Sequence, residues 1–192
     1  DTPSKDVGED GKHTLRYIAK RCRHGLNYRM HFIKLAEVTG LSLAAAQEAY
    51  TRYHRITPEL RVWWDSLTEE VKRNRVLYSA MGRRWVLTEP LSEMTLESIV
   101  AFKPQSTIGD KVLQVIYQAE DDDDWPHDAR ICMNIHDALI GIAPIAKADT
   151  CLRIMRKYAE QPIYIRNQPP LIIPTSLAIT TRGWNVRDLP AF

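Results

Sequence analysis

The strongest constraint on the fold is a series of helix signals that occupies the first 75 residues. In residues 12–27, apolar side chains recur at helical spacing, namely Leu15, Ile18, Ala19, Cys22 and Leu26. Residues 28–38 continue as a second, shorter helical pattern. Gly40 follows it, and glycine commonly stands just after a helix end. The chain is therefore predicted to open with two consecutive helices.

Two further helices are predicted immediately downstream. Ser42 is a favoured N-cap residue and predicts a helix that runs to about residue 55. Thr57-Pro58-Glu59 combines an N-cap residue, a proline in the first turn and an early acid, which predicts a fourth helix to about residue 73. Most of the first 75 residues should thus form a helical subdomain.

The pattern changes after residue 75, where short apolar runs alternate with helical ones. Strands are expected at 76–80 and 85–87 around Gly82, and again at 129–135, 139–142 and 176–181. Helices are expected at 95–102, 105–118 and 144–160. We therefore predict an α+β protein: a helical subdomain, then a part with a small antiparallel sheet packed on helices.

Charge is balanced overall but unevenly distributed. The formal net charge of the 192 residues is +2, which by itself indicates no nucleic-acid partner. No acidic residue occurs from Gly11 to Ala36, a stretch that is rich in lysine, arginine and histidine, whereas residues 120–124 are all acidic. We interpret the acidic run as a solvated loop, because adjacent acids on a flexible loop lack the fixed geometry of a metal site.

The three cysteines, Cys22, Cys132 and Cys151, are far apart and form no CxxC pair. A zinc ribbon and a disulfide framework are therefore not indicated, and a reducing compartment is the simpler expectation. All three are predicted to be small core residues. Neither a secretory signal nor an apolar run long enough to span a membrane is recognisable.

A basic stripe is predicted along the first helix. Arg16, Lys20, His24 and Tyr28 are spaced four residues apart, so they follow one slowly winding face. Two cations one turn apart suit a triphosphate, and the imidazole and the phenol would then lie near a sugar and a base. A solvated basic helix face explains the same spacing, so both interpretations stay open at this point.

A second candidate site is the predicted turn between the runs at 129–135 and 139–142. His136 and Asp137 occupy its tip, where a carboxylate is both exposed and held by two strands. Such a carboxylate suits Mg²⁺, which prefers oxygen ligands and also takes substrate phosphates. An ordinary turn, in which aspartate is frequent, is the alternative.

Five segments in the same order resemble family A DNA polymerases, the group that includes the Klenow fragment. RYIAKRCRHGLNYRM resembles the nucleotide-binding helix of that family, and LAEVTGLSLAAAQEAYTRYHRITPELRVWWDSL resembles the helices that complete its fingers. MGRRWVL, PQSTIGDKVLQVIYQ and NIHDALIGI resemble its Gly-Arg-Arg turn, its glutamine-containing palm helix and its palm hairpin. The resemblance implies a linker at 1–11, fingers at 12–81 and part of a palm at 82–192.

The resemblance also implies roles for the basic stripe in nucleotide binding. Arg16 and Lys20 would hold the incoming dNTP, and Tyr28 would lie beside the nascent base pair. His24 stands where the family has phenylalanine or tyrosine, at a position tied to sugar discrimination, so sugar selectivity is open. Arg29 replaces the glycine that usually follows the tyrosine.

For the primer–template DNA, the resemblance places Gln105 near the minor groove and His136 at the primer terminus, with Asp137 as a ligand of catalytic Mg²⁺. Arg83 and Arg84 follow Gly82 and are candidates for contacts with DNA phosphates. Solvated arginines at a structural turn are the alternative. Such a protein is expected in the cytoplasm or associated with the nucleoid, with a phage or a bacterial host as its source.

One carboxylate strand of the family is not recognisable in this sequence. The family's other essential aspartate precedes the basic helix, and Ala138 replaces the glutamate that usually follows the metal-binding aspartate. We therefore expect the second carboxylate of a two-metal site to come from an amino-terminal polymerase portion, in the same or a separate polypeptide. These 192 residues alone are predicted not to synthesise DNA.

Two other functions fit parts of the same sequence. A single-subunit RNA polymerase also carries His-Asp without a following glutamate, although GLNYRM and GRR favour the DNA enzyme. A non-catalytic DNA-binding module would keep the basic helix and lack the chemistry. Trp63 and Trp64 in the fourth helix are candidates for stacking on template bases, but one of them is expected in the core.

Overall fold

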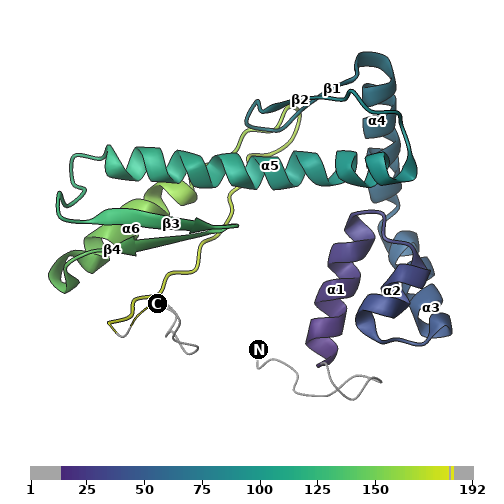
Figure 1. Ribbon diagram of the computed structural model, residues 1–192, viewed down its shortest axis with the longest axis horizontal. Coiled ribbons are helices and arrows are strands. Elements are labelled where there is room, and N and C mark those ends of the chain that lie inside the picture. The colour runs from purple at the N-terminus through teal and green to yellow at the C-terminus, as the bar shows by residue number, and fades with distance from the viewer. Residues whose placement is uncertain (1–13, 182, 184–192) are drawn as a thin grey trace. The chain divides into compact units, whose positions relative to one another are not determined.

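The structure is a computed structural model that describes residues 14–181 and 183. The expected linker at 1–11 lies outside the described residues. The helices are α1 (Leu15–Asn27), α2 (Phe32–Thr39), α3 (Leu43–Ile56), α4 (Pro58–Asn74), α5 (Glu93–Glu120) and α6 (Ala148–Ala159), with a 3₁₀ turn η1 (Ile145–Lys147) (Figure 1). The strands are β1 (Val76–Tyr78), β2 (Arg84–Val86), β3 (Arg130–Ile135) and β4 (Ala138–Ile142). They form two antiparallel pairs, so the α+β prediction is confirmed.

Local signals explain the ends of the first helices. The Thr14 and Ser42 hydroxyls accept hydrogen bonds from the amides of Tyr17 and Ala45, as N-cap residues do. Gly40 ends α2 with a φ of +73°, a conformation that costs glycine little. The second helix begins at Phe32 and not at residue 28 as predicted, because the backbone turns at Arg29, where φ is +68°.

The chain divides into two compact units. One unit comprises Asp1–Leu77 and Trp85–Phe102, and the other comprises Tyr78–Arg84 and Lys103–Phe192. The helix α5 and the β1–β2 hairpin contribute residues to both units.

Two hydrophobic clusters stabilise the first unit. Leu26, Leu35 and Ala46 join α1, α2 and α3. The other cluster joins α4, the segments around β1 and β2 and the first turns of α5. Its buried residues are Trp64, Leu67, Val71, Leu77, Leu87, Ile99 and Val100. Trp64 is buried and Trp63 is only partly buried, which confirms that one of the two tryptophans is a core residue.

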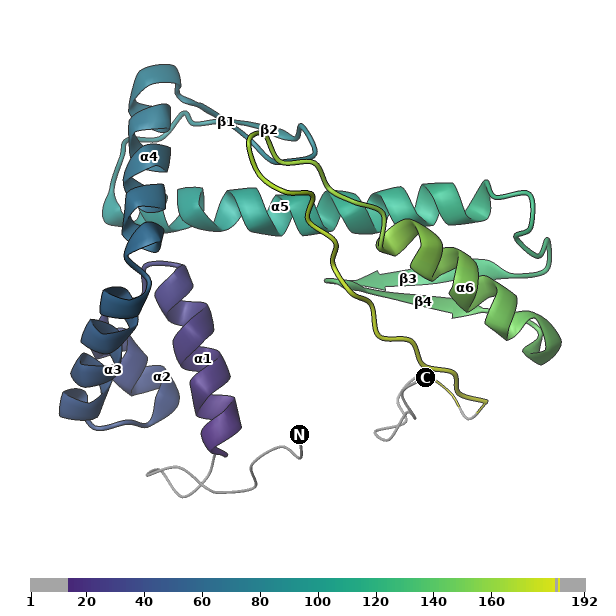
Figure 2. The same ribbon diagram turned by 180° about the vertical axis from the view of Figure 1, so that it is seen from behind.

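In the second unit, the larger part of α5 packs with the β3–β4 hairpin and α6 (Figures 1 and 2). Its buried apolar residues come from α5, from the start of the hairpin and from α6 and the segment behind it: Val112, Val115, Ala119, Ala129, Cys151, Ile154 and Ile163. None of the described helices is both long and apolar enough to cross a bilayer.

Three secondary-structure predictions are wrong. The helices expected at 95–102 and 105–118 are one helix, α5, which continues through Pro104. Buried residues lie on both sides of the proline, such as Val100 and Val112. Their packing stabilises one continuous helix although proline has a low helix propensity. The strand expected at 176–181 does not form, and the helix expected from residue 144 starts as the 3₁₀ turn.

The cysteine prediction is correct for Cys151 and wrong for Cys132. Cys151 is buried, Cys22 is half-buried and Cys132 is exposed. Cys132 lies at an irregularity of the β3–β4 ladder, because Ile131 pairs with Gly141 and Met133 pairs with Ile140. A bulge inserts an unpaired residue and interrupts the alternation of faces, which the period of the sequence does not reveal.

Candidate functional site

The predicted basic stripe lies on α1, opposite the buried face of that helix. Ile18 and Leu26 are buried, whereas Arg16, Lys20 and His24 are exposed. Neither Arg16 nor Lys20 makes a hydrogen bond or an ion pair with a residue that the structure describes. Among residues 14–181 and 183, the two cations therefore stand one turn apart without an internal partner.

Other cations of this region are bound to the protein itself. Arg21 donates a hydrogen bond to the Val38 carbonyl oxygen at 2.9 Å, and its guanidinium lies 5.1 Å from the centroid of the Tyr17 ring. Arg29 forms an ion pair with Glu93. This contrast separates Arg16 and Lys20 from the arginines that stabilise the fold.

The carboxyl end of the stripe is partly buried. The rings of His24 and Tyr28 meet edge to face with centroids 4.8 Å apart, and Tyr28 also packs against the cluster around Trp64. The stripe therefore runs from two exposed cations to an aromatic pair that the fold holds in place.

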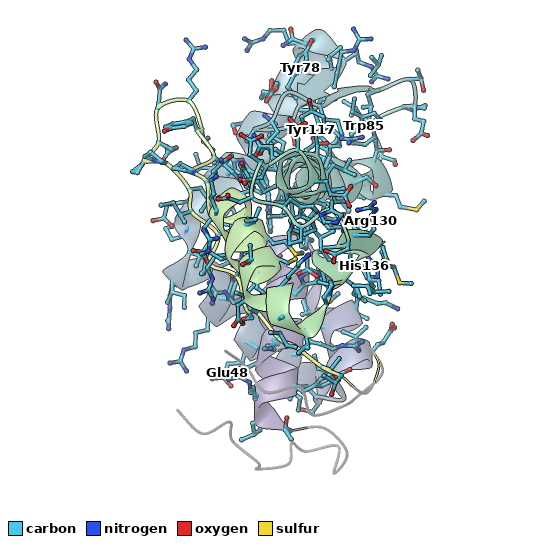
Figure 3. The ribbon with its side chains drawn as sticks, turned by 90° about the vertical axis from the view of Figure 1, so that its left-hand side faces the viewer. Glu48, Tyr78, Trp85, Tyr117, Arg130 and His136 are labelled. Carbon is cyan, nitrogen blue, oxygen red and sulfur yellow. The ribbon has the colours of Figure 1, made fainter. Side chains whose placement is uncertain are left out.

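The second candidate site lies at the tip of the β3–β4 hairpin. Ile135 pairs with Ala138, so His136 and Asp137 form a two-residue loop, and both are exposed. His136 has a φ of +55°, a conformation that costs a non-glycine residue on the order of 1–3 kcal/mol. Figure 3 shows His136 and Arg130 on this hairpin in a view along α5. The strained turn presents the Asp137 carboxylate outside the ladder.

A pocket of about 520 Å³ opens beside Asp137 within the second unit. Its lining comes from α5, the start of β4, α6 and the segment 173–178, and this segment passes the hairpin tip (Figures 1 and 2). The lining residues are Ile108, Lys111, Val112, Val115, Asp137, Ala138, Leu139, Leu152, Met155, Arg156, Ala159 and residues 173–178. Among the described strands, β4 pairs with β3 alone.

Two cations line this pocket. Lys111 is only 5% exposed, and burial lowers the pKa of its ammonium group because it removes water from the charged form. Its Nζ donates a hydrogen bond to the Gln114 side-chain oxygen at 3.3 Å. Arg156 donates to the Thr175 carbonyl oxygen at 3.4 Å, and its Nε has no hydrogen-bond partner. The Arg156 guanidinium also forms an ion pair with Glu160, with Nε 3.7 Å from Oε1. The positive charge in this pocket that has no ion-pair partner among the described residues is therefore that of Lys111.

The three predicted DNA contacts have different surroundings. Arg83 is bound to Asp110 of α5, with Nε 2.8 Å from Oδ1, and this carboxylate raises the pKa of the guanidinium. Arg84 and Gln105 are exposed, and neither forms a side-chain hydrogen bond or an ion pair with a described residue. The structure brings Arg83 and Gln105 into the second unit, as it does Asp137, whereas the stripe on α1 belongs to the first.

Comparison with known proteins assigns the family. Residues 4–181 match the sequence model described as DNA polymerase family A. The chain belongs to this family. It is similar to the DNA polymerase of Mycobacterium phage D29, with 26% identity over 170 residues, and to the thermostable DNA polymerase I of Thermus aquaticus, with 24% identity over 177 residues.

These matches cover 88% and 86% of this family A chain, but only 26% and 20% of the two relatives, so the chain spans about a quarter of their length or less. Its fold is similar to a solved structure described as the POL domain of Pol1 from M. smegmatis in complex with DNA primer-template and dNTP. The TM-score is 0.67 with 18% identity, over 75% of this chain and 27% of that one.

Family membership makes Mg²⁺ the relevant metal, and Asp137 fits it as one ligand. Mg²⁺ is usually bound by one or two carboxylates, with water and substrate phosphates as further ligands. Within residues 14–181 and 183, no group of three or more His, Cys, Asp or Glu side chains is placed to hold a metal ion. Asp137 would therefore be one ligand of a site that the described residues do not complete.

Sequence reasoning overlooked two features of this family A chain. Lys111 follows Ile108 by three residues and precedes Val115 by four, so helical spacing already placed it on the buried face of α5. The segment 173–178 has no such signal, because its position beside Asp137 depends on contacts with α6. Thr175 donates to Glu160 through its amide at 2.9 Å and its hydroxyl at 2.8 Å.

Proposed function

We propose that this chain carries the nucleotide-binding helix and one metal-binding carboxylate of a template-directed DNA polymerase. The observation that carries the proposal is the contrast on α1. Arg16 and Lys20 are exposed and have no partner among the described residues, whereas Arg21 and Arg29 are bound to the protein. Membership of DNA polymerase family A supports a triphosphate as the ligand of Arg16 and Lys20.

In the proposed reaction, the primer 3′-hydroxyl attacks the α-phosphate of a dNTP, and pyrophosphate leaves. Arg16 and Lys20 hold the triphosphate and neutralise charge that develops on it, as positioned cations do in phosphoryl transfer. His24 and Tyr28 contact the sugar and the base. Bound Mg²⁺ supplies activation of the hydroxyl and stabilisation of the leaving group.

The remaining assignments follow the same proposal. Asp137 is a Mg²⁺ ligand, and His136 contacts the primer terminus. Gln105, Arg83 and Arg84 contact primer–template DNA, where Arg83 would have to leave Asp110 or bind phosphate beside it. Residues 12–81 act as fingers and residues 82–192 as part of the palm.

We further propose that a second carboxylate reaches Asp137 on a strand from an amino-terminal polymerase portion. The edge of β4 that pairs with none of the described strands would offer hydrogen-bonding groups to such a strand, and the pocket beside Asp137 offers space for its side chains. Lys111 and Arg156 provide positive charge there. In primer extension with Mg²⁺ and four dNTPs, the 192-residue chain alone should give no product, and extension by it would contradict this requirement.

The nucleotide-binding role is tested in a polymerase that contains this chain. Lys20→Ala should raise the KM for dNTP by about 10- to 100-fold, because a charge-assisted hydrogen bond contributes about 1.5–3 kcal/mol.

In the same polymerase, Asp137→Asn should lower kcat by about 10³-fold, since a metal ligand provides several kcal/mol of charge stabilisation. The control is Arg23→Ala, an exposed cation of α1 outside the stripe, and it should change neither constant more than twofold. An equal change of the KM for dNTP in Lys20→Ala and Arg23→Ala would contradict the proposal.

A further inference from the structure

The backbone at the end of α1 adopts a conformation that is usual for glycine, yet the residue there is Arg29. The Met30 amide donates to the Gly25 carbonyl oxygen at 2.9 Å, closing the helix, and Arg29 has a φ of +68°. Helix ends of this type usually carry glycine at the left-handed position, because a Cβ atom is strained there. Because the left-handed backbone is strained at Arg29, we expect contacts of its side chain to compensate for that strain.

The Arg29 side chain connects α1 with two other helices of the first unit. Its Nη2 lies 3.2 Å from Oε2 of Glu93, the first residue of α5. Its guanidinium lies 5.3 Å from the ring centroid of Trp64, a core residue of α4. The Arg29 side chain is 22% exposed and that of Glu93 is 83% exposed. Since exposed ion pairs contribute little, the stacking on Trp64 is the stronger of the two contacts.

Arg29 also lies next to the aromatic end of the basic stripe. Trp64 donates from its indole nitrogen to the Asn27 carbonyl oxygen at 3.2 Å, so the same ring contacts α1 on both sides of Tyr28. Tyr28 meets His24 edge to face at 4.8 Å. A shift of Arg29 relative to Trp64 would therefore move Tyr28 and, through it, His24.

We infer that Arg29 is a positioning residue, which holds Tyr28 and His24 in the orientation that contacts the sugar and base of an incoming nucleoside triphosphate. This inference rests on the proposed function for its ligand. Its structural part is that Arg29 fixes the conformation of the end of α1, and this part is supported by the contacts of Arg29 with Trp64 and Glu93. The two parts are tested by separate measurements.

The first measurement is amide hydrogen exchange in the 192-residue chain. Arg29→Asn keeps a residue that tolerates the left-handed conformation and removes the guanidinium. It should accelerate exchange at the amides of Tyr28 and Met30 about tenfold relative to their intrinsic rates. Arg29→Lys, which keeps the charge without the planar stack, should give an intermediate rate. Glu93→Gln should change the exchange rates of these two amides less than threefold. The control Arg23→Asn, on α1, should leave these rates unchanged. Unchanged exchange in Arg29→Asn would falsify the structural part.

The second measurement is single-nucleotide incorporation by a polymerase that contains this chain. Arg29→Asn should raise the KM for the correct dNTP about tenfold and change kcat less than twofold, with partial recovery in Arg29→Lys. A merely structural loss would reduce the active fraction, and thus kcat, at constant KM. That result would overturn the positioning role. If the unsubstituted polymerase incorporates no nucleotide, the proposed function fails, and hydrogen exchange still decides whether Arg29 holds Tyr28.

Discussion

At the scale of single residues, Asp122 shows that one member of the acidic run at 120–124 has a structural role. Its carboxylate accepts hydrogen bonds from Lys157 and from the Tyr158 hydroxyl, both at 2.7 Å, and from the Asp124 amide at 3.0 Å. These contacts tie the loop after α5 to α6. The hydrogen bond from Lys157, followed by that from Tyr158, lowers the pKa of Asp122 from 3.8 to about 2. The sequence predicted a solvated loop throughout, and that prediction is wrong for Asp122.

We predict that Asp122→Asn lowers the free energy of unfolding at neutral pH. The depressed pKa means that the folded state favours the ionised carboxylate, so this stabilisation is present above pH 3.8 and lost as the pH falls through about 2. The difference between the unsubstituted chain and Asp122→Asn in urea unfolding should therefore shrink between pH 4 and pH 2. The exposed neighbour Asp123→Asn serves as the control. A difference that is constant with pH would contradict the assignment of the pKa.

At the scale of elements, α5 is notable because it continues through Pro104 and contributes to both units. Proline lacks an amide hydrogen, so the carbonyl of Val100 loses its usual helical partner. The helix persists because Ile99 and Val100 are buried on one side of Pro104, and Val112 and Val115 on the other. Packing in the two units therefore outweighs an unfavourable residue near the point where α5 passes from one unit to the other.

Pro104→Ala should raise the free energy of unfolding by about 2 kcal/mol. Alanine is favoured over proline in a helix interior by about 3 kcal/mol, and a more flexible unfolded chain offsets up to about 1 kcal/mol of this. Chemical denaturation monitored by circular dichroism measures the change. Glu97→Ala, at an exposed position of the same helix, should stay within about 0.5 kcal/mol of the unsubstituted chain. Destabilisation by Pro104→Ala would show that the proline ring is itself a packing element.

At the scale of the whole molecule, the described residues build two units with separate buried clusters. Leu26 belongs to the cluster of α1, α2 and α3 in the first unit, whereas Ile154 is buried on α6 in the second. The proposed nucleotide-binding stripe and the proposed metal ligand are thus supported by different cores. Chains with separate cores need not unfold in one transition.

Leu26→Ala should destabilise the first unit by about 2–5 kcal/mol, because it leaves a cavity at a fully buried position. Ile154→Ala should do the same to the second unit. Hydrogen exchange at the protected amides of each unit separates the two effects, with each variant as the control for the other. Loss of protection in both units from either substitution would show that they unfold as one cooperative body.

The helical half of the fold was largely predictable from the sequence. Ser42 and Gly40 act over a few residues, and they mark the ends of α2 and α3 as predicted. The predictions failed where distant residues decide. Pro104 is retained within a helix by the packing of both units, and the turn at Arg29 delays α2 although residues 28–31 carry a helical pattern.

The candidate site divides in the same way. The spacing of Arg16 and Lys20 determined that they share one face of a helix, and the two apolar runs around His136-Asp137 determined a hairpin with an exposed carboxylate. These are local consequences of helical and strand periods. Only the tertiary structure decided that Arg21 and Arg29 are bound within the protein, because their partners lie 17 and 64 residues away in the sequence. It also decided that a pocket with a buried lysine lies beside Asp137, since that arrangement joins α5, β4, α6 and the segment 173–178, and no period along the chain encodes contacts between them.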